Sequence, residues 1–326
     1  MRRTVAIALV LFTALSPACG GGAVPAARAG SDSGHASQGR QSTATAGRSS
    51  APADSPLAVV DGAGRRVTLA APAARVISLI PSVNELIVAM GGADRLVART
   101  DYDKDPRLAE LPSVGGGLTP SLEWIAQRRP DLVIGWPDTR SRSLVQRLGE
   151  LSIPVYTAPS QTIEDALSVA KDLGVLLGRH AAADSLVRAI RTGLDSVRTS
   201  VAGESEPDVL YLIGLDPPMG AGPGTFVDEL LDVAGGRNVL EDTGVLWPQL
   251  SLEEILRRNP DVVIVAQAPE QPGLLAHLHR TAGWSSLRAV RDGRVYQVDA
   301  YRYNRPGPHM VDIARDLAGL LHGAHP

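Results

Sequence analysis

The 326-residue sequence has one cysteine, few aromatic residues (4%) and a net charge of only −3. A single cysteine rules out an internal disulfide. With no basic patch and no Arg-rich run interleaved with aromatics, nucleic acid is not an expected partner. The apolar run from Val5 to Leu15 is too short to cross a bilayer. What remains is a globular chain whose 44% hydrophobic content can fill two ordinary cores.

The N-terminal segment has the layout of a signal peptide. Met1-Arg2-Arg3 precedes the apolar run, and the small residues Ser16-Pro17-Ala18 lie directly before Cys19. We therefore expect residues 1–18 to be a signal peptide that is removed after export. Residues 19–56 are rich in Gly, Ala, Ser and Thr and are predicted to form a flexible tether.

Cys19 lies at the predicted cleavage point, a position that resembles a bacterial lipobox. Lipoboxes usually carry leucine three residues before the cysteine, whereas Leu15 is four before it. A free thiol at the start of an exported chain has no evident use, whereas a lipid there would anchor the protein to a membrane. We interpret Cys19 as the lipidation site, with ordinary cleavage after Ala18 as the alternative.

One pattern occurs twice, at residues 121–134 and at residues 251–264. Each copy has a serine suited to cap a helix, a short helical segment, a Pro-Asp pair and an apolar run. The apolar run is short enough for a buried parallel strand. Because half of an αβ unit is written twice, two similar lobes are expected.

Each copy also carries a glutamate two residues after its cap, Glu123 and Glu253. Acids in a first helical turn stabilise the helix dipole, and this explains most isolated cases. Glu254 follows Ser251 by three residues and is expected to close a capping box, which leaves Glu253 free. Free acids at matched positions of both copies are therefore candidate contacts for a partner.

From His180 to about Val201 the sequence has no proline, and its apolar residues recur at helical spacing. Such a helix is about 30 Å long, enough to join two lobes. We predict an N-terminal lobe at residues 57–178, a connecting helix at residues 179–203 and a C-terminal lobe at residues 204–326. Strands and helices alternate in both lobes, so the fold class is α/β, with a ligand cleft between the lobes.

The motifs that carry a family resemblance are Arg75-Val-Ile-Ser-Leu-Ile-Pro-Ser-Val-Asn-Glu-Leu, Thr100-Asp-Tyr, both Ser-Leu-Glu…Pro-Asp copies, Phe226…Ala234-Gly-Gly-Arg-Asn and Asn304-Arg-Pro-Gly-Pro. Together, from about Leu57 to Leu321, they resemble the substrate-binding proteins of ABC importers for cobalamin and iron–siderophores. The resemblance implies two Rossmann-like α/β lobes joined by a single long helix, and a monomer on the periplasmic or extracytoplasmic face. It implies no catalysis, no cofactor and no bound metal, and docking of Glu123 and Glu253 against the permease dimer.

The resemblance also implies a set of ligand-binding residues: Pro81, Tyr102, Met219, Trp247 and Arg305. Trp247-Pro-Gln resembles the cobalamin-binding members, so a corrinoid is the expected ligand, with an iron–siderophore or haem as the alternative. Gly117 and Met219 stand where those members have tryptophan and phenylalanine, which thins the expected aromatic surface. The other tryptophans are expected to pack in the lobes: Trp124, Trp136 and Trp284.

Two other binding functions fit less well. The loop Gly220-Ala-Gly222-Pro-Gly224 lacks the glycine spacing of a dinucleotide site, and its proline removes an amide that a phosphate cradle would use. A metal-binding protein of the same architecture needs three or four converging ligands, whereas His277 and His279 form a lone pair and His322 and His325 lie in the tail.

An enzyme is the alternative from a different class. Ser82, Asn84 and Glu85 lie at the start of an expected helix and could suggest a catalytic group. No nucleophile sits in an elbow motif, and no histidine neighbours a candidate in the sequence, so capping and packing explain these residues better.

Overall fold

The computed structural model describes residues 56–137, 139–268 and 274–323. Cys19, the predicted signal peptide and nearly all of the predicted tether lie outside the described residues. Residues Pro52–Pro326 form one compact unit. In the part of the chain that is described, no helix is long and apolar enough to cross a bilayer.

The N-terminal half, from β1 to α4, is built on a parallel three-stranded sheet in the order β3-β4-β5, preceded by the antiparallel hairpin β1–β2. The elements are β1 (Leu57–Val60), β2 (Arg66–Leu69), β3 (Val76–Ser78), α1 (Pro81–Ala89), the 3-10 turns η1 (Ala93–Arg95) and η2 (Pro106–Leu108), α2 (Leu122–Gln127), β4 (Leu132–Gly135), α3 (Thr139–Glu150), β5 (Val155–Thr157) and α4 (Ile163–Leu176).

The C-terminal half, from β6 to α11, has a five-stranded sheet in the order β10-β9-β6-β7, with β8 also pairing with β6. All of its pairs are parallel except β6 with β7. The elements are β6 (Asp208–Leu215), β7 (Pro218–Gly220), α6 (Phe226–Val233), β8 (Arg237–Asn238), α7 (Leu252–Arg258), β9 (Val262–Gln267), α8 (Leu274–Arg280), η3 (Trp284–Ser286), α9 (Arg288–Arg291), β10 (Val295–Asp299), α10 (Ala300–Tyr303) and α11 (Met310–His322).

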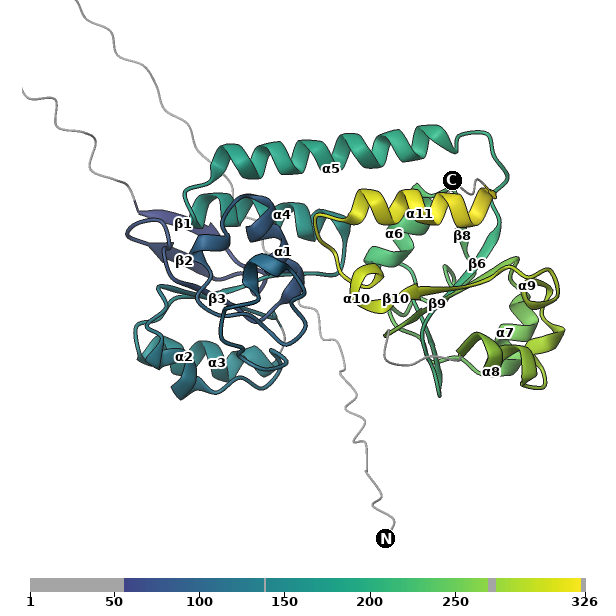
Figure 1. The fold of residues 1–326 in the computed structure, drawn as a ribbon, viewed down its shortest axis with the longest axis horizontal. Coiled ribbons are helices and arrows are strands. Elements are labelled where there is room, and N and C mark those ends of the chain that lie inside the picture. Colours follow the sequence, from purple (N-terminus) through teal and green to yellow (C-terminus); the bar gives the residue numbers. More distant parts are fainter. Residues whose placement is uncertain (1–55, 138, 269–273, 324–326) are drawn as a thin grey trace, which may run out of the picture. The chain divides into compact units, whose positions relative to one another are not determined.

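The helix α5 (His180–Ser200) connects the two halves, as the proline-free periodic stretch predicts. Its apolar stripe is buried at Ile190, Leu194 and Val197. The helix packs on α4 of the N-terminal half and on α6 and α11 of the C-terminal half. Figure 1 shows α5 running alongside α4 and α11. A rigid element therefore links the two sheets.

Along the central strands β4 and β9, neighbouring side chains point to opposite faces of the sheet and pack into different hydrophobic cores. Leu132 of β4 and Ile264 of β9 belong to one large core that both halves share beneath α4, α5, α6 and α11. Their neighbours Val133 and Val263 face separate cores on the opposite side of each sheet. Pulling the halves apart would expose this shared core to water, at a free-energy cost of about 25 cal/mol per Å² of apolar surface. Large opening motions are therefore disfavoured.

The duplicated pattern forms matching helices. The hydroxyl of Ser121 accepts a hydrogen bond from the Trp124 amide at the start of α2, and Ser251 accepts one from the Glu254 amide at the start of α7. The capping box expected at the start of α7 is only half formed, because Ser251 caps the helix but the Glu254 side chain does not bond back to the Ser251 amide. The Glu254 carboxylate bonds to the guanidinium groups of Arg257 and Arg258 instead, because these cations lie one turn along the helix.

Candidate functional site

A cavity of about 400 Å³ is lined by residues from both halves of the protein. Four of the five side chains that the sequence motifs assign to ligand binding are among its lining: Pro81, Tyr102, Trp247 and Arg305. The lining also includes Ser82, Gly116, Leu118, Trp136, Ser160, Gln161, Ala300, Asn304 and Pro306. Tyr102 and Trp247 come from opposite halves of the protein.

Tyr102 is held at the cavity by a hydrogen-bonded turn. The carboxylate of Asp103 accepts hydrogen bonds from the Thr100 amide (2.6 Å) and from Asn84 Nδ2 (2.9 Å) on α1. The guanidinium of Arg305 donates to the carbonyl oxygen of Tyr102 (3.2 Å), a bond that crosses between the halves. The Tyr102 ring also lies 5.8 Å from the ring of Tyr301 on α10. The turn therefore presents a 40% exposed tyrosine in a fixed position.

Trp247 lies on a loop that is fixed by its backbone rather than by burial. The Gly220 amide donates to the Pro248 carbonyl (3.0 Å), and the Gly222 amide donates to the Leu246 carbonyl (2.8 Å). These bonds extend the β7 region along the loop on both sides of Trp247. The indole remains 37% exposed, so it is not a core residue of the C-terminal half.

Trp136 is the aromatic lining residue that the sequence did not identify. It directly follows β4, and it was expected only to pack within the N-terminal half. Its indole does pack against the shared core, yet it also lines the cavity. The Nε1–H group is buried and has no hydrogen-bond partner in the described structure, which is unusual because buried indole donors normally find one. The other two tryptophans do not line the cavity. Trp284 is buried, as expected, and the ring of Trp124 is covered by the guanidinium of Arg128.

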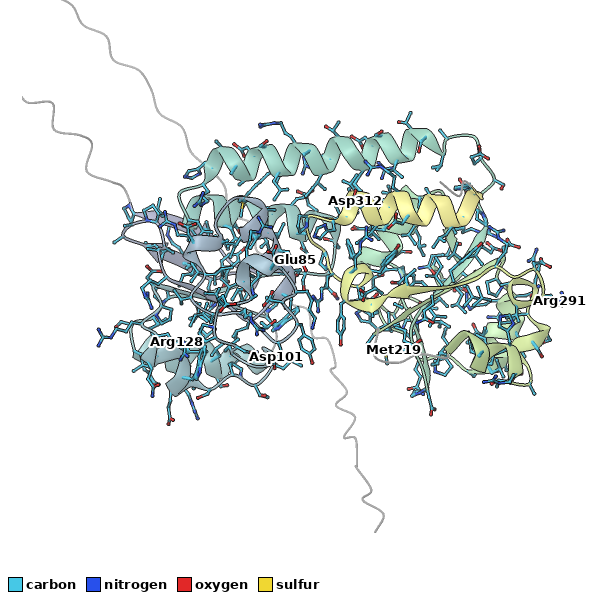
Figure 2. All side chains as sticks on the ribbon, viewed as in Figure 1. Glu85, Asp101, Arg128, Met219, Arg291 and Asp312 are labelled. Atoms are coloured by element: carbon cyan, nitrogen blue, oxygen red, sulfur yellow. The ribbon has the colours of Figure 1, made fainter. Side chains whose placement is uncertain are left out.

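Met219 and Gly117 occupy the two positions where the sequence departs from the cobalamin-binding pattern. Met219 is half-buried on β7 and is not among the cavity's lining residues (Figure 2). Gly117 has φ of +80°, and a Cβ atom there would collide with the carbonyl oxygen of Leu79. The backbone therefore excludes a tryptophan at position 117, and the aromatic surface of the cavity is carried by Tyr102, Trp136 and Trp247.

We expect Gly117→Ala to destabilise the protein by about 3 kcal/mol or more, because left-handed backbone strain adds to a collision with rigid backbone. Gly115→Ala is the matched control. Gly115 has a similar φ of +83° but open space around its Cα atom, so only the strain of about 1 kcal/mol applies. Urea unfolding of the two variants measures the difference, and equal losses would contradict the collision.

Glu85 on α1, labelled in Figure 2, forms an ion pair with the cavity residue Arg305 (3.8 Å), and this pair joins the two halves. Burial raises the pKa of the Glu85 carboxyl from 4.5 to about 7. Arg305 opposes this rise, whereas the neighbouring carboxylates Asp103 and Asp105 add to it. The Glu85 carboxyl is therefore only partly ionised near neutral pH, so its ion pair with Arg305 is only partly formed there.

Replacing Glu85 with glutamine should make stability less sensitive to pH. The folded protein keeps the Glu85 proton to a higher pH than the unfolded chain does. The contribution of this proton to the free energy of unfolding is therefore fully present below pH 4.5 and is lost as the pH rises through 7. Because glutamine cannot titrate, the Glu85→Gln variant should not lose this stability. Between pH 4.5 and pH 7.5 the free energy of unfolding of the wild type should therefore fall by about 2–3 kcal/mol relative to that of the variant. Thermal unfolding from pH 4.5 to 7.5 tests this, with the exposed Glu110→Gln as control; parallel curves for Glu85→Gln and wild type would refute it.

The duplicated glutamates lie outside the cavity. Glu123 in the first turn of α2 and Glu253 in the first turn of α7 are both exposed. Within the described residues, neither carboxylate has a hydrogen bond or an ion pair. Figure 1 shows α2 and α7 on the side of the sheets opposite α5. Both acids are therefore free for a partner that approaches this side.

A second, larger groove of about 750 Å³ lies beneath α5 and beside α6. Its lining carries seven carboxylates and three arginines and no aromatic residue, and several of these charges pair across it, for example Arg191 with Glu164 (2.8 Å). The His and carboxylate residues of the described chain form no group of three that could hold a metal. The smaller aromatic cavity is therefore the better candidate for a ligand site.

Known proteins are similar to this chain in sequence and in architecture. The family described as periplasmic binding protein matches residues 76–301. The vitamin B12-binding protein of Vibrio cholerae is 27% identical over 77% of this chain and 90% of its own length. An uncharacterised ABC transporter substrate-binding lipoprotein of Bacillus subtilis is 27% identical over 82% of this chain and 86% of its own length.

Solved structures of related proteins also match. A periplasmic heme-binding protein from Pseudomonas aeruginosa has a TM-score of 0.68 at 26% identity, covering 78% of this chain and 94% of that one. A protein of an ABC-type Fe3+-hydroxamate transport system from Saccharomonospora viridis has a TM-score of 0.69 at 25% identity, covering 81% and 98%. From its sequence and fold, the chain belongs to the periplasmic binding protein family, and it is a substrate-binding component of an ABC transporter.

Proposed function

We propose that the protein captures a corrinoid, such as cobalamin, in the aromatic cavity and delivers it to the permease of its importer. The observation that carries the proposal is that Tyr102 and Trp136 from one half and Trp247 from the other line one cavity. Aromatic faces on two sides suit a large, flat macrocycle. Similarity to a vitamin B12-binding protein over most of the chain supports the same ligand class.

In this proposal residues 57–178 and 204–326 act as two lobes about the connecting helix, residues 179–203. The Phe226 amide donates to the Gln161 carbonyl (2.5 Å), and the Ile163 amide donates to the Glu229 carboxylate (2.5 Å). These bonds join the lobes beside the shared core, so ligand capture needs only a small closure. The protein works as a monomer.

Haem or an iron–siderophore is the second candidate ligand. The observation that favours it is the exposed Tyr102 phenol at the cavity, because a phenolate can coordinate ferric iron. Arg305 crosses to the backbone of Tyr102 and adds positive charge beside it. The similarity to heme-binding and Fe3+-hydroxamate transport proteins agrees with this alternative.

A ligand panel separates the candidates. Purified protein is mixed with cyanocobalamin, with haem or with a ferric hydroxamate siderophore, and the absorbance of what co-elutes in gel filtration is recorded. Corrinoid binding should survive Tyr102→Phe, which keeps the aromatic face. A haem complex should instead lose its ligand-to-metal absorption in that variant. Co-elution of haem or siderophore and not of cyanocobalamin would overturn the corrinoid proposal.

We also propose that a lipid on Cys19 anchors the protein to the membrane. Cys19→Ser should release it into the soluble extracytoplasmic fraction with its ligand affinity unchanged, because the tether separates the anchor from the folded part. Fractionation of cells followed by a ligand titration measures both results. Retention of the variant in the membrane would refute lipidation as the anchor.

A further inference from the structure

Most of the large hydrophobic side chains that are exposed to solvent either line the aromatic cavity or belong to the chain segment next to it. The described chain has seven such residues, and only Val60 and Leu151 lie elsewhere. Three of the other five line the cavity itself: Tyr102, Leu118 and Trp247. The remaining two, Val245 and Leu246, directly precede Trp247 in the chain. Exposed apolar groups that share one surface, as Tyr102, Leu118 and Trp247 do, mark an interaction site, whereas scattered ones need no explanation.

The exposure of Val245 and Leu246 is built into the backbone. The Gly222 amide donates to the Leu246 carbonyl (2.8 Å), and the Gly220 amide holds the Pro248 carbonyl. Any side chain at position 222 would collide with the Val245 carbonyl oxygen, so the loop can approach only a glycine there. Since both flanks of Trp247 are fixed, the two apolar side chains cannot turn inward by a local adjustment.

Leu118 continues this surface from the other half. It follows Gly117, whose positive φ and close approach to the Leu79 carbonyl fix the direction of the chain. Leu118 is 50% exposed although it also lines the cavity. The two halves therefore each present an aliphatic edge beside an exposed aromatic residue, Tyr102 on one side and Trp247 on the other.

We propose that Leu118, Val245 and Leu246 form an apolar collar that covers the periphery of the bound ligand where it projects from the cavity. A cavity of about 400 Å³ is near the lower end of ligand pockets and is too small for a whole macrocycle with its side groups. Leu118 lines the cavity, and Val245 and Leu246 directly precede the lining residue Trp247 in the chain, which favours the ligand over another protein as the occupant of the collar. The collar selects large ligands with apolar edges and disfavours small, hydrophilic chelates. This inference rests on the proposed function.

The collar can be tested with substitutions that keep the fold. Leu118→Ser and Leu246→Ser should each weaken binding of cyanocobalamin about fivefold, and the double variant about twentyfold, because several apolar groups no longer leave water on binding. Leu151→Ser is the matched control: it is the same change at a leucine that is 55% exposed outside the cavity. Calorimetry gives the affinities, and urea unfolding shows that the variants remain folded. If wild-type protein binds haem instead, the same series is run with haem; binding of the hydrophilic siderophore alone would overturn the collar.

The outcomes separate the collar from the proposed function. Wild-type protein that binds none of the three ligands would overturn the proposed function and the collar with it. Wild-type binding that is unchanged in the double variant would overturn the collar alone. Unchanged affinity together with impaired uptake would assign these side chains to the permease. Equal losses in Leu151→Ser and the collar variants would also contradict the inference.

Discussion

Changing Glu123 and Glu253 together to arginine is expected to abolish ligand uptake by cells while leaving the affinity of the purified protein unaltered. Both carboxylates are exposed, lie in first helical turns and have no partner in the described structure. We propose that they dock against arginines of the two permease subunits, as the family resemblance implies. Replacing each acid with a cation places like charges in contact at both ends of the complex, and such repulsion costs several kcal/mol.

The controls for this double variant follow from the surface. Glu110→Arg/Glu204→Arg makes the same change in net charge at two other exposed glutamates and should transport normally. Each single variant, Glu123→Arg or Glu253→Arg, should be intermediate, with a defect in reconstituted membranes that depends on salt. Normal transport by the Glu123/Glu253 double variant, or loss of ligand binding itself, would show that these acids only stabilise the helix dipole or belong to the ligand site.

The elements that the sequence predicts well are those whose signals are local. The helix α5 follows from apolar spacing between His180 and Val201, and α2 and α7 follow from a serine cap and a proline stop. The helix α4 was not among the expected elements. Its signal was present, because Thr162 and Asp165 form a complete capping box at its start. A capping box alone is a weak signal, because the same residue types also occur in turns.

Most of the candidate site was predicted through sequence motifs. The features that the sequence did not predict depend on contacts between residues that lie far apart in the chain. Trp136 follows a buried strand, and no local pattern shows that one face of its ring reaches a cavity shared with the other half. The glycine at 117 looked like a lost aromatic residue, whereas the chain needs it there because Leu79 approaches from a distant strand end. The raised pKa of Glu85 likewise depends on burial and on Arg305, more than 200 residues along the chain.

Replacing Trp247 with alanine is expected to weaken ligand binding by about 1–3 kcal/mol, a loss of about fivefold to 150-fold, without unfolding the protein. The indole is 37% exposed and its loop is held by backbone hydrogen bonds of Gly220 and Gly222, so the substitution leaves no core cavity. Stability should therefore change by about 0.5 kcal/mol or less. What is lost is the aromatic face that the C-terminal half presents to the cavity.

Two companion variants decide whether the loss comes from stacking on the ligand. Trp247→Phe keeps an aromatic face and should recover most of the affinity. Trp124→Ala removes an indole of the same kind outside the cavity, where Arg128 covers it, and should leave the affinity unchanged. Calorimetry with the ligand identified in the panel measures all three. An affinity that is unchanged in Trp247→Ala, or lost equally in Trp124→Ala, would remove Trp247 from the ligand site, because only a residue that contacts the ligand can produce the expected order of alanine below phenylalanine below tryptophan.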